Sequence, residues 1–204
     1  MSTSALSNRN FSIYFAGTLV VLHGLWIYRL TISWFAWDLT HSVFLVGVVS
    51  FCQFAPGIVL GPVFGAAADR YNLIKMAVFI HAGMMVISLV LAVITGLDRL
   101  TIEVLAGFAL LQGMMGGAYT PTRLSLITKL VPRELFASAT GYLAVAFNLS
   151  RFAGPALAGL IINFFWGLPG PSDCLRVLSY PQLLAFTLSN RWGARRASLG
   201  IRTF

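Results

Sequence analysis

The sequence is poor in charge, in cysteine and in the residue clusters that bind metals. Charged residues make up 10% of its 204 residues, and apolar residues make up 58%. An ordinary soluble domain has about a quarter charged and about half apolar residues. The two cysteines, Cys52 and Cys174, indicate no disulfide framework and no metal site. These shortages exclude an ordinary soluble domain and indicate an integral membrane protein.

The motifs of soluble enzymes are absent as well. The sequence has no Gly-x-Ser-x-Gly, no glycine-rich phosphate loop with lysine, no paired carboxylates and no Cys/His cluster with metal-ligand spacing. We therefore expect no enzymatic activity, no cofactor and no bound metal. The net charge of +8 comes from loops and the tail, so nucleic-acid binding is not needed to explain it.

Five apolar stretches have the length of about 20 residues that a helix needs to cross a bilayer. They are residues 11–37, 43–68, 76–96, 102–121 and 137–166. No period of two runs through them, which favours helices over a barrel. The first stretch is too long for a signal-peptide core, so we expect it to be retained. The predicted fold class is an all-α integral membrane protein with about five transmembrane helices.

Basic residues are concentrated in alternate loops. One side has Arg9, Arg70, Lys75, Arg123, Lys129 and Arg133, and the opposite loops have only Arg99. Cationic loops resist translocation across the membrane. We therefore expect a multi-pass protein of the plasma (inner) membrane with its amino terminus in the cytoplasm.

The second apolar stretch has a glycine at every fourth position and ends in a charged cluster. Gly57, Gly61 and Gly65 fall on one helix face, where small residues let a neighbouring helix approach closely. Asp69 follows four residues later on that face, at the boundary with water. We interpret the end of this stretch as a loop that docks and releases; the alternative is that the glycines only pack tightly. The candidate conformational-switch residues are Gly65, Asp69, Arg70 and Lys75.

A short phrase recurs three spans apart. It reads Gly61-Pro62-Val-Phe-Gly65-Ala66 in the second span and Gly154-Pro155-Ala-Leu-Ala158-Gly159 in the fifth. A three-plus-three repeat within a six-helix half leaves such a recurrence. The alternative is coincidence, because glycine, alanine and proline are common in membrane helices. The candidate helix-packing residues are Gly57, Gly61, Gly154, Pro155 and Gly159.

With these motifs, residues 8–162 resemble the amino-terminal half of a major facilitator superfamily transporter, in its multidrug and siderophore exporter branch. Gly65-x-x-x-Asp69-Arg70-x-Asn72-x-x-Lys75 is similar to the family's loop between helices two and three, with Asn72 where glycine is usual. Gly154-Pro155-x-x-x-Gly159 resembles the fifth-helix motif of antiporters. Leu130-Val-Pro132-Arg-Glu134-Leu-x-Ala137-Ser-Ala139 resembles the loop between helices four and five. The family's fourth-helix arginine should lie near Ala109, where this chain has none.

The resemblance implies a secondary transporter whose two halves rock about a central site. It implies proton-coupled efflux of a small amphipathic compound, drug-like or siderophore-like. The acid that matches Asp69 is implied to brace the second helix against the opposite half in one conformation, with help from a helix-end dipole. The implied partners are a small-molecule substrate, the lipid bilayer, and either a second copy of the chain or a missing second half.

Two arginines, Arg29 and Arg151, fall inside apolar stretches. A charge there costs about 2.5 kcal/mol or more unless it faces protein or water. Arg29 either reaches the outer interface or faces a cavity, and for Arg151 we favour a water-filled pathway over a structural pair with a helix carbonyl. Asp38 and Glu103 are either further residues of a substrate or proton pathway or simply solvated helix ends.

The pattern lacks a normal sixth span. Helix breakers and charges occupy the place where that span should begin, at Pro169, Gly170, Pro171, Asp173, Arg176 and Pro181. We therefore divide the chain into a transmembrane half with five helices, residues 1–167, and an irregular basic tail, residues 168–204, that resembles a truncated or out-of-frame continuation. The leading hypothesis is a truncated exporter. The alternative is a non-transporting membrane fragment or assembly subunit that packs with a partner through the second-helix glycine face.

Overall fold

The computed structural model describes residues 5–165, and side chains for residues 5–160. This part consists of helices and contains no strand. The helices are η1 (Ala5–Ser7), α1 (Arg9–Thr40), α2 (Val43–Val59), α3 (Gly61–Arg70), α4 (Leu73–Gly96), α5 (Ile102–Leu130), η2 (Arg133–Leu135) and α6 (Phe136–Phe165). The predicted tail, residues 168–204, lies outside the described residues, together with the domain boundary placed before it.

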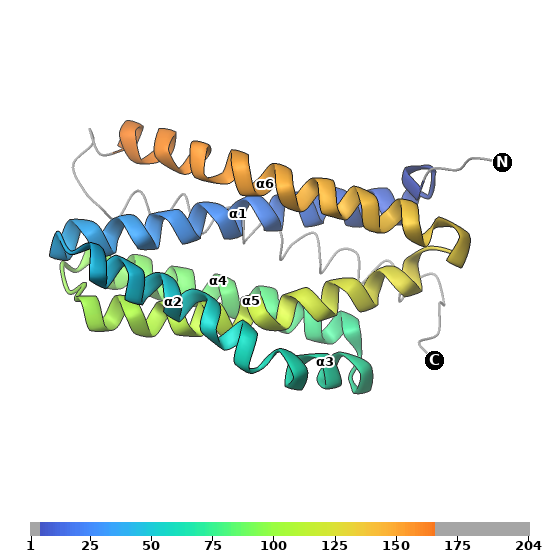
Figure 1. Ribbon diagram of the computed structural model, residues 1–204, viewed down its shortest axis with the longest axis horizontal. Coiled ribbons are helices and arrows are strands. Elements are labelled where there is room, and N and C mark those ends of the chain that lie inside the picture. Colours follow the sequence, from blue (N-terminus) through green and yellow to red (C-terminus); the bar gives the residue numbers. More distant parts are fainter. Residues whose placement is uncertain (1–4, 166–204) are drawn as a thin grey trace.

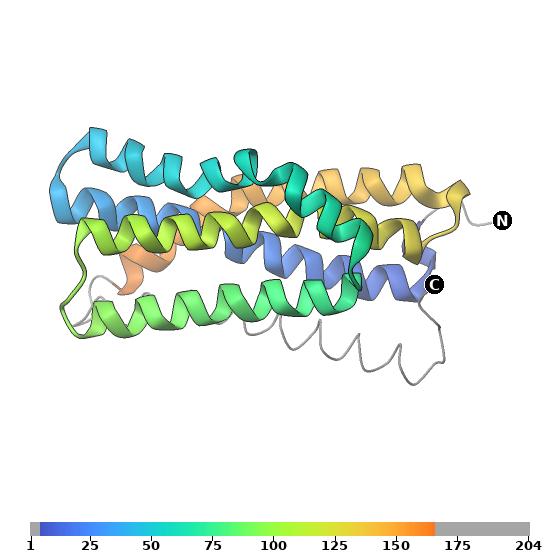
Figure 2. The same cartoon turned by 90° about the horizontal axis from the view of Figure 1, so that it is seen from below.

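The long helices run along one another in a bundle (Figures 1 and 2). Four of them are long and apolar enough to cross a membrane, and α2 with α3 makes a fifth if the bent pair is one span. The α1–α2 and α4–α5 connections lie at one end of the bundle, and the α3–α4 and α5–α6 connections lie at the other (Figure 1). The predicted all-α membrane fold with about five spanning helices is confirmed.

Two groups of helices make up the bundle. α6 packs along α1, and α5 packs between α2 and α4, with α3 against its carboxyl-terminal part. The groups meet where α1 contacts α2 and α5. In Figure 1, α6 and α1 form the upper layer and α2, α4 and α5 the lower one. One face of the bundle is bordered by α6 and α2, and α1 and α5 lie behind these two helices.

The second predicted span is not one straight helix. α2 and α3 meet at Leu60 with a bend of 48°. Pro62 in the first turn of α3 has no backbone N–H to donate to the carbonyl of Ile58, so the helical hydrogen-bond ladder is interrupted there. The expected continuous glycine-striped helix is therefore wrong: Gly57 belongs to α2, whereas Gly61 and Gly65 belong to α3.

The fourth predicted span, residues 102–121, was too short. α5 continues through Pro121 to Leu130, as membrane helices do when neighbouring groups compensate for the missing N–H. Arg123, which the loop-charge pattern placed in a cytoplasmic loop, therefore lies inside α5. At 1.5 Å per residue it is about 10 Å from the end of that helix.

Side chains cap the starts of the long helices. Oδ1 of Asn72 accepts hydrogen bonds from the backbone N–H groups of Ile74 and Lys75, at 3.0 and 3.2 Å. A cap of this kind stabilises a helix by about 1 kcal/mol. The asparagine that departs from the family's usual glycine is thus the residue that begins α4.

Candidate functional site

Two arginines from different helices share one tryptophan ring in the middle of the bundle. Cζ of Arg29, on α1, lies 5.0 Å from the centroid of the Trp26 ring, and Cζ of Arg151, on α6, lies 5.9 Å from it. Cζ of Arg29 also lies 4.3 Å from the centroid of the Phe54 ring on α2. Both guanidinium groups are within the range of cation–π attraction.

Arg123 joins this group through a second ring. Its Cζ lies 5.9 Å from the centroid of Phe147 on α6 and 5.8 Å from that of Tyr119 on α5. Phe147 meets Trp26 edge to face, with centroids 5.9 Å apart. Aromatic contacts therefore connect three cations from three helices. We call Arg29, Arg123, Arg151, Trp26 and Phe147 the arginine cluster.

Arg29 and Arg151 of the arginine cluster lie well inside their helices. At 1.5 Å per residue, Arg29 is about 16 Å from the end of α1 and Arg151 is about 22 Å from the start of α6. The hydrocarbon core is about 30 Å thick. The Arg29 guanidinium is half-buried and lies over the rings of Trp26 and Phe54.

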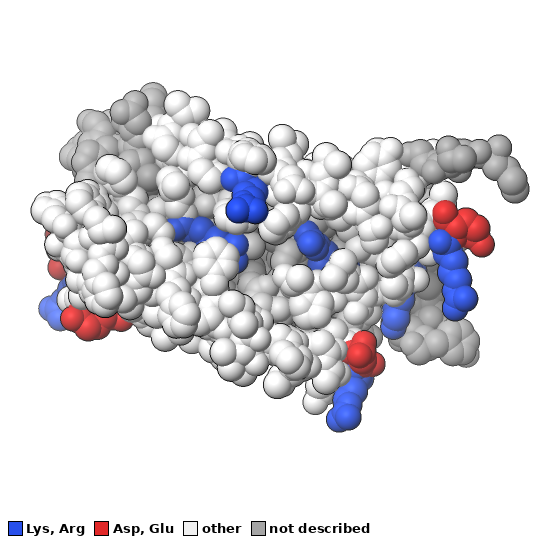
Figure 3. All heavy atoms as spheres, viewed as in Figure 1, with Lys and Arg blue, Asp and Glu red and all other residues white. Residues whose placement is uncertain are grey.

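Figure 3 shows Lys and Arg atoms in a shallow furrow between α6 and α2, with Asp and Glu atoms of this face only at the two ends. Arg29 and Arg123 are half-buried, and Arg151 is exposed. The acidic residues of the described part all lie at helix ends or in connections: Asp38, Asp69, Asp98, Glu103 and Glu134. Within residues 5–160 the three arginines of the cluster make no ion pair.

Several polar atoms of the cluster have no hydrogen-bond partner. In the described part of the chain, Nε and Nη1 of Arg123 and Nε1 of Trp26 are buried and unpaired. Buried donors without partners are rare in proteins, because each loses the hydrogen bonds that it makes with water. These three donors therefore have no acceptor within residues 5–160.

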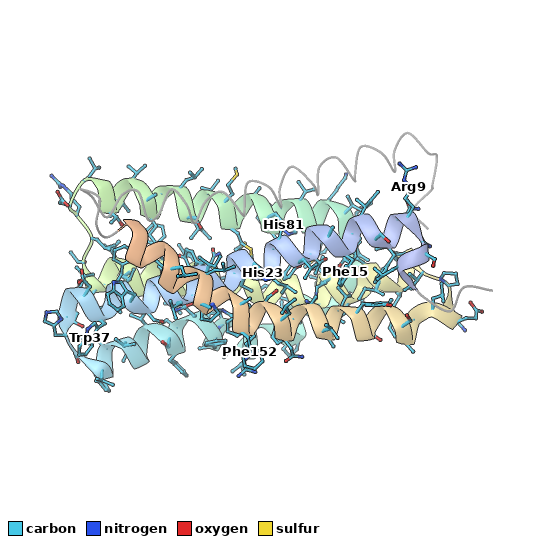
Figure 4. All side chains as sticks on the ribbon, turned by 90° about the horizontal axis from the view of Figure 1, so that it is seen from above. Arg9, Phe15, His23, Trp37, His81 and Phe152 are labelled. Atoms are coloured by element: carbon cyan, nitrogen blue, oxygen red, sulfur yellow. The ribbon has the colours of Figure 1, made fainter. Side chains whose placement is uncertain are left out.

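Two histidines lie half-way along the bundle, on α1 and α4 (Figure 4). Nδ1 of His23 lies 2.8 Å from the carbonyl oxygen of Leu19 and 2.9 Å from Oγ of Ser150. Nδ1 of His81 lies 2.6 Å from the carbonyl oxygen of Ala77. Each ring is thus held by a hydrogen bond to a backbone carbonyl group of its own helix, and His23 also connects α1 to α6.

The structure does not bring the predicted outer acids to the arginine cluster. Asp38 in the last turn of α1 and Glu103 in the first turn of α5 are both exposed. They belong to the end of the bundle where Figure 4 shows Trp37. Of the two readings that the sequence leaves open for them, their positions suit solvated helix ends.

The predicted switch residues lie at the opposite end. Asp69 and Arg70 are exposed in the last turn of α3, and Lys75 is exposed in the first turn of α4. Asp69 stands at the carboxyl end of its own helix, where the helix dipole disfavours a negative charge. Any helix dipole that stabilises Asp69 must therefore belong to another element.

The predicted packing glycines divide into two groups. A Cβ atom on Gly154 would lie 2.5 Å from Cβ of Trp26, and one on Gly57 would lie 3.4 Å from Cα of Gly117. The other three have nothing within 4 Å of such an atom: Gly61, Gly65 and Gly159. Gly154 and Gly57 therefore mark real helix crossings. Pro155, next to Gly154, lies inside α6.

The sequence reading missed two close contacts on α5 and one arginine. A Cβ atom on Gly113 would lie 2.7 Å from the carbonyl oxygen of Gln53, and one on Gly117 would lie 2.6 Å from Cα of Gly57. The sequence places Arg123 in a loop, because the predicted span ends at Pro121. The leucines and isoleucine that follow it, up to Leu130, are the signal that would have placed Arg123 inside a helix.

Comparison with known proteins identifies relatives of this chain. The family described as transmembrane secretion effector, of the major facilitator type, matches residues 1–203. A staphyloferrin A transporter of Staphylococcus aureus is 26% identical over 153 residues, which are 74% of this chain and 38% of that protein. The chain therefore spans well under half the length of this relative. No solved structure matches the chain.

Proposed function

Because the chain belongs to the transmembrane secretion effector family of the major facilitator superfamily, we propose that it takes part in proton-coupled efflux of a small amphipathic compound across the plasma (inner) membrane. The observation that carries the proposal is the arginine cluster, a set of unpaired cations at membrane depth on one face of the bundle. Charges at this depth are expensive and usually mark a substrate or ion pathway.

The arginine cluster forms one wall of the proposed substrate site. In transporters of this type the site lies at the interface between two halves, near the middle of the bilayer. The furrow of Figure 3 lies on the face of the bundle that α6 and α2 border. We therefore propose that a second half, or a second copy of the chain, closes the site, and that rocking of the two walls exposes it to each side in turn. In this mechanism the exposed loop at Asp69 braces one of the two conformations.

Transport in everted membrane vesicles tests this function. With the full 204-residue chain, we expect small amphipathic compounds to release protons from energised vesicles, as read with a pH-sensitive dye. Arg123→Gln should reduce this response at least tenfold, because it removes a charge from the proposed site. Arg99→Gln, at the end of the bundle, is the matched control and should leave it unchanged. Normal amounts of chain without any response would contradict transport by this chain.

The proposed orientation places the amino terminus in the cytoplasm. The basic residues remain unequally divided between the two ends of the bundle when Arg123 is left out. Arg99 lies at one end, and five basic residues lie at the opposite end: Arg9, Arg70, Lys75, Lys129 and Arg133. Reporter tags inserted after Ser42 and Thr101 should be accessible from outside, and tags after Lys75 and Glu134 from the cytoplasm. The reverse pattern of labelling would contradict this orientation.

A second candidate function is that of an assembly subunit that does not itself transport. It is favoured by the open space at Gly61 and Gly65 of α3 and by exposed apolar side chains beside them, Ile58 at 77% and Val63 at 61%. A partner helix would fit such a surface. A defined oligomer on a blue-native gel that is lost in Gly61→Leu, together with absent transport, would favour this candidate over the first.

A further inference from the structure

The arginine cluster has a charge balance that indicates the class of its ligand. Three guanidinium groups from α1, α5 and α6 share aromatic neighbours, and no carboxylate pairs with them within residues 5–160. Like charges repel one another strongly where the surroundings are apolar. Rings attract a cation only weakly compared with a carboxylate, and they accept no full hydrogen bond from it. The cluster is therefore left with excess positive charge.

The geometry points to an anion as the missing partner. We propose that the arginine cluster binds an organic anion that carries two or more carboxylate or comparable oxyanion groups on a flat apolar body. The oxyanions accept hydrogen bonds from the exposed guanidinium group of Arg151 and from the half-buried ones of Arg29 and Arg123. The apolar body lies against Trp26 and Phe147. This proposal rests on the proposed function, because it names the substrate class of the same site.

A structural role alone does not account for the three arginines. A guanidinium that only holds helices together is normally surrounded by acceptors, as buried donors are. Arg151 is exposed, and the furrow shown in Figure 3 gives a ligand access to the cations. The acids that would neutralise the cations in a purely structural network lie at the ends of the described helices. The sixth acid of the sequence, Asp173, lies outside the described residues.

Direct binding to the purified 204-residue chain tests the proposal without a transport assay. The probe is 2,6-naphthalenedicarboxylate, titrated calorimetrically into the chain in a non-ionic detergent. The matched neutral probe is 2,6-naphthalenedimethanol, which has the same rings without charge. We expect the dicarboxylate to bind at least tenfold more tightly than the neutral compound, and its affinity to fall as salt is added. Equal affinities for the two probes would overturn the proposal.

Substitutions locate the binding to the cluster. We expect Arg123→Gln and Arg151→Gln each to raise the Kd of the dicarboxylate about tenfold or more, since each removes charge-assisted hydrogen bonds. Arg151→Lys keeps the charge but loses the planar fork of the guanidinium group. Its Kd for the dicarboxylate should lie between those of the unchanged chain and of Arg151→Gln. Arg99→Gln, at the end of the bundle, is the control. Because Arg151 is exposed, its variants keep the proposal testable if Arg123→Gln fails to fold. Unchanged affinity in Arg151→Gln would overturn the proposal.

An anionic lipid headgroup offers the same oxyanion chemistry, and a further arm separates the two sources. The chain is placed in nanodiscs of phosphatidylcholine alone or with one third phosphatidylglycerol, and the dicarboxylate titration is repeated. We expect binding in both, with at most a small loss in the mixed lipid. Loss of dicarboxylate binding in the nanodiscs with phosphatidylglycerol would show that the cluster holds a lipid headgroup. That result would overturn the proposal of a soluble ligand. Binding without transport would leave this inference standing and contradict only the proposed function.

Discussion

Gly154→Ala is expected to destabilise the chain, whereas Gly159→Ala in the same motif is not. The added Cβ atom at Gly154 would lie 2.5 Å from Cβ of Trp26 and 3.6 Å from the backbone of His23 and Ile27. The Cβ atom of Trp26 and the backbone of α1 cannot turn aside as the end of a long side chain can. The added Cβ atom therefore forces α6 away from α1. Such overpacking costs about 1 to 3 kcal/mol. A Cβ atom on Gly159 meets nothing within 4 Å, so that variant gains the helix propensity of alanine.

The thermal midpoint of the detergent-solubilised chain measures this difference. We expect Gly154→Ala to lower it by several degrees, at about 2 to 4 °C for each kcal/mol in a chain of this size. Gly159→Ala should leave it unchanged or slightly raised. Gly154 also contacts Trp26 of the arginine cluster, so the same variant should weaken anion binding. Equal midpoints for the two variants would contradict the close crossing of α1 and α6.

The second large effect is expected at Gly113, where α5 crosses α2. A Cβ atom there would lie 2.7 Å from the carbonyl oxygen of Gln53 and 2.9 Å from that of Cys52. Carbonyl oxygens of a helix backbone cannot turn away as a flexible side chain does. About one turn further along α5, Gly117 already lies against Gly57 of α2. The two helices therefore have no room to slide along each other. Gly113→Ala should therefore be at least as destabilising as Gly154→Ala.

Gly107→Ala is the matched control for Gly113→Ala. It lies on the same helix, and its Cβ atom would meet nothing within 4 Å. We expect a normal thermal midpoint for Gly107→Ala and a lower one, with less chain recovered in the monodisperse fraction, for Gly113→Ala. A Gly113→Ala variant as stable as Gly107→Ala would mean that the two helices stand further apart than the structure has them.

The recurring Gly-Pro phrase shows how far a motif predicts contacts. The sequence offers Gly57, Gly61, Gly154 and Gly159 as candidate packing residues. The structure has close neighbours at Gly57 and Gly154, and nothing within 4 Å of a Cβ atom on Gly61 or Gly159. The bend at Leu60 explains part of this difference, because it turns α3 away from the line of α2. Spacing along a sequence fixes which residues share a face of a straight helix, but not whether another helix reaches that face.

The candidate substrate-pathway residues show the same division. Arg29 and Arg151 were found from the sequence because a charge in an apolar stretch is visible without any structure. Arg123 was missed, and no spacing in the sequence indicates that one tryptophan, Trp26, lies beside two of these arginines. Asp38 and Glu103, which the sequence reads either as pathway residues or as solvated helix ends, are exposed at the ends of α1 and α5.

By itself the sequence determined that this is a helical membrane protein with about five spans, because the cost of placing apolar and charged groups in a bilayer adds up residue by residue along the chain. It also carried the motifs that identify the family. Tertiary structure alone decided which glycines are contacts, where the second span bends, and that Arg29, Arg123 and Arg151 come together. Those outcomes depend on the angles and positions at which helices far apart in the sequence cross, and a crossing is fixed by the packing of both partners at once.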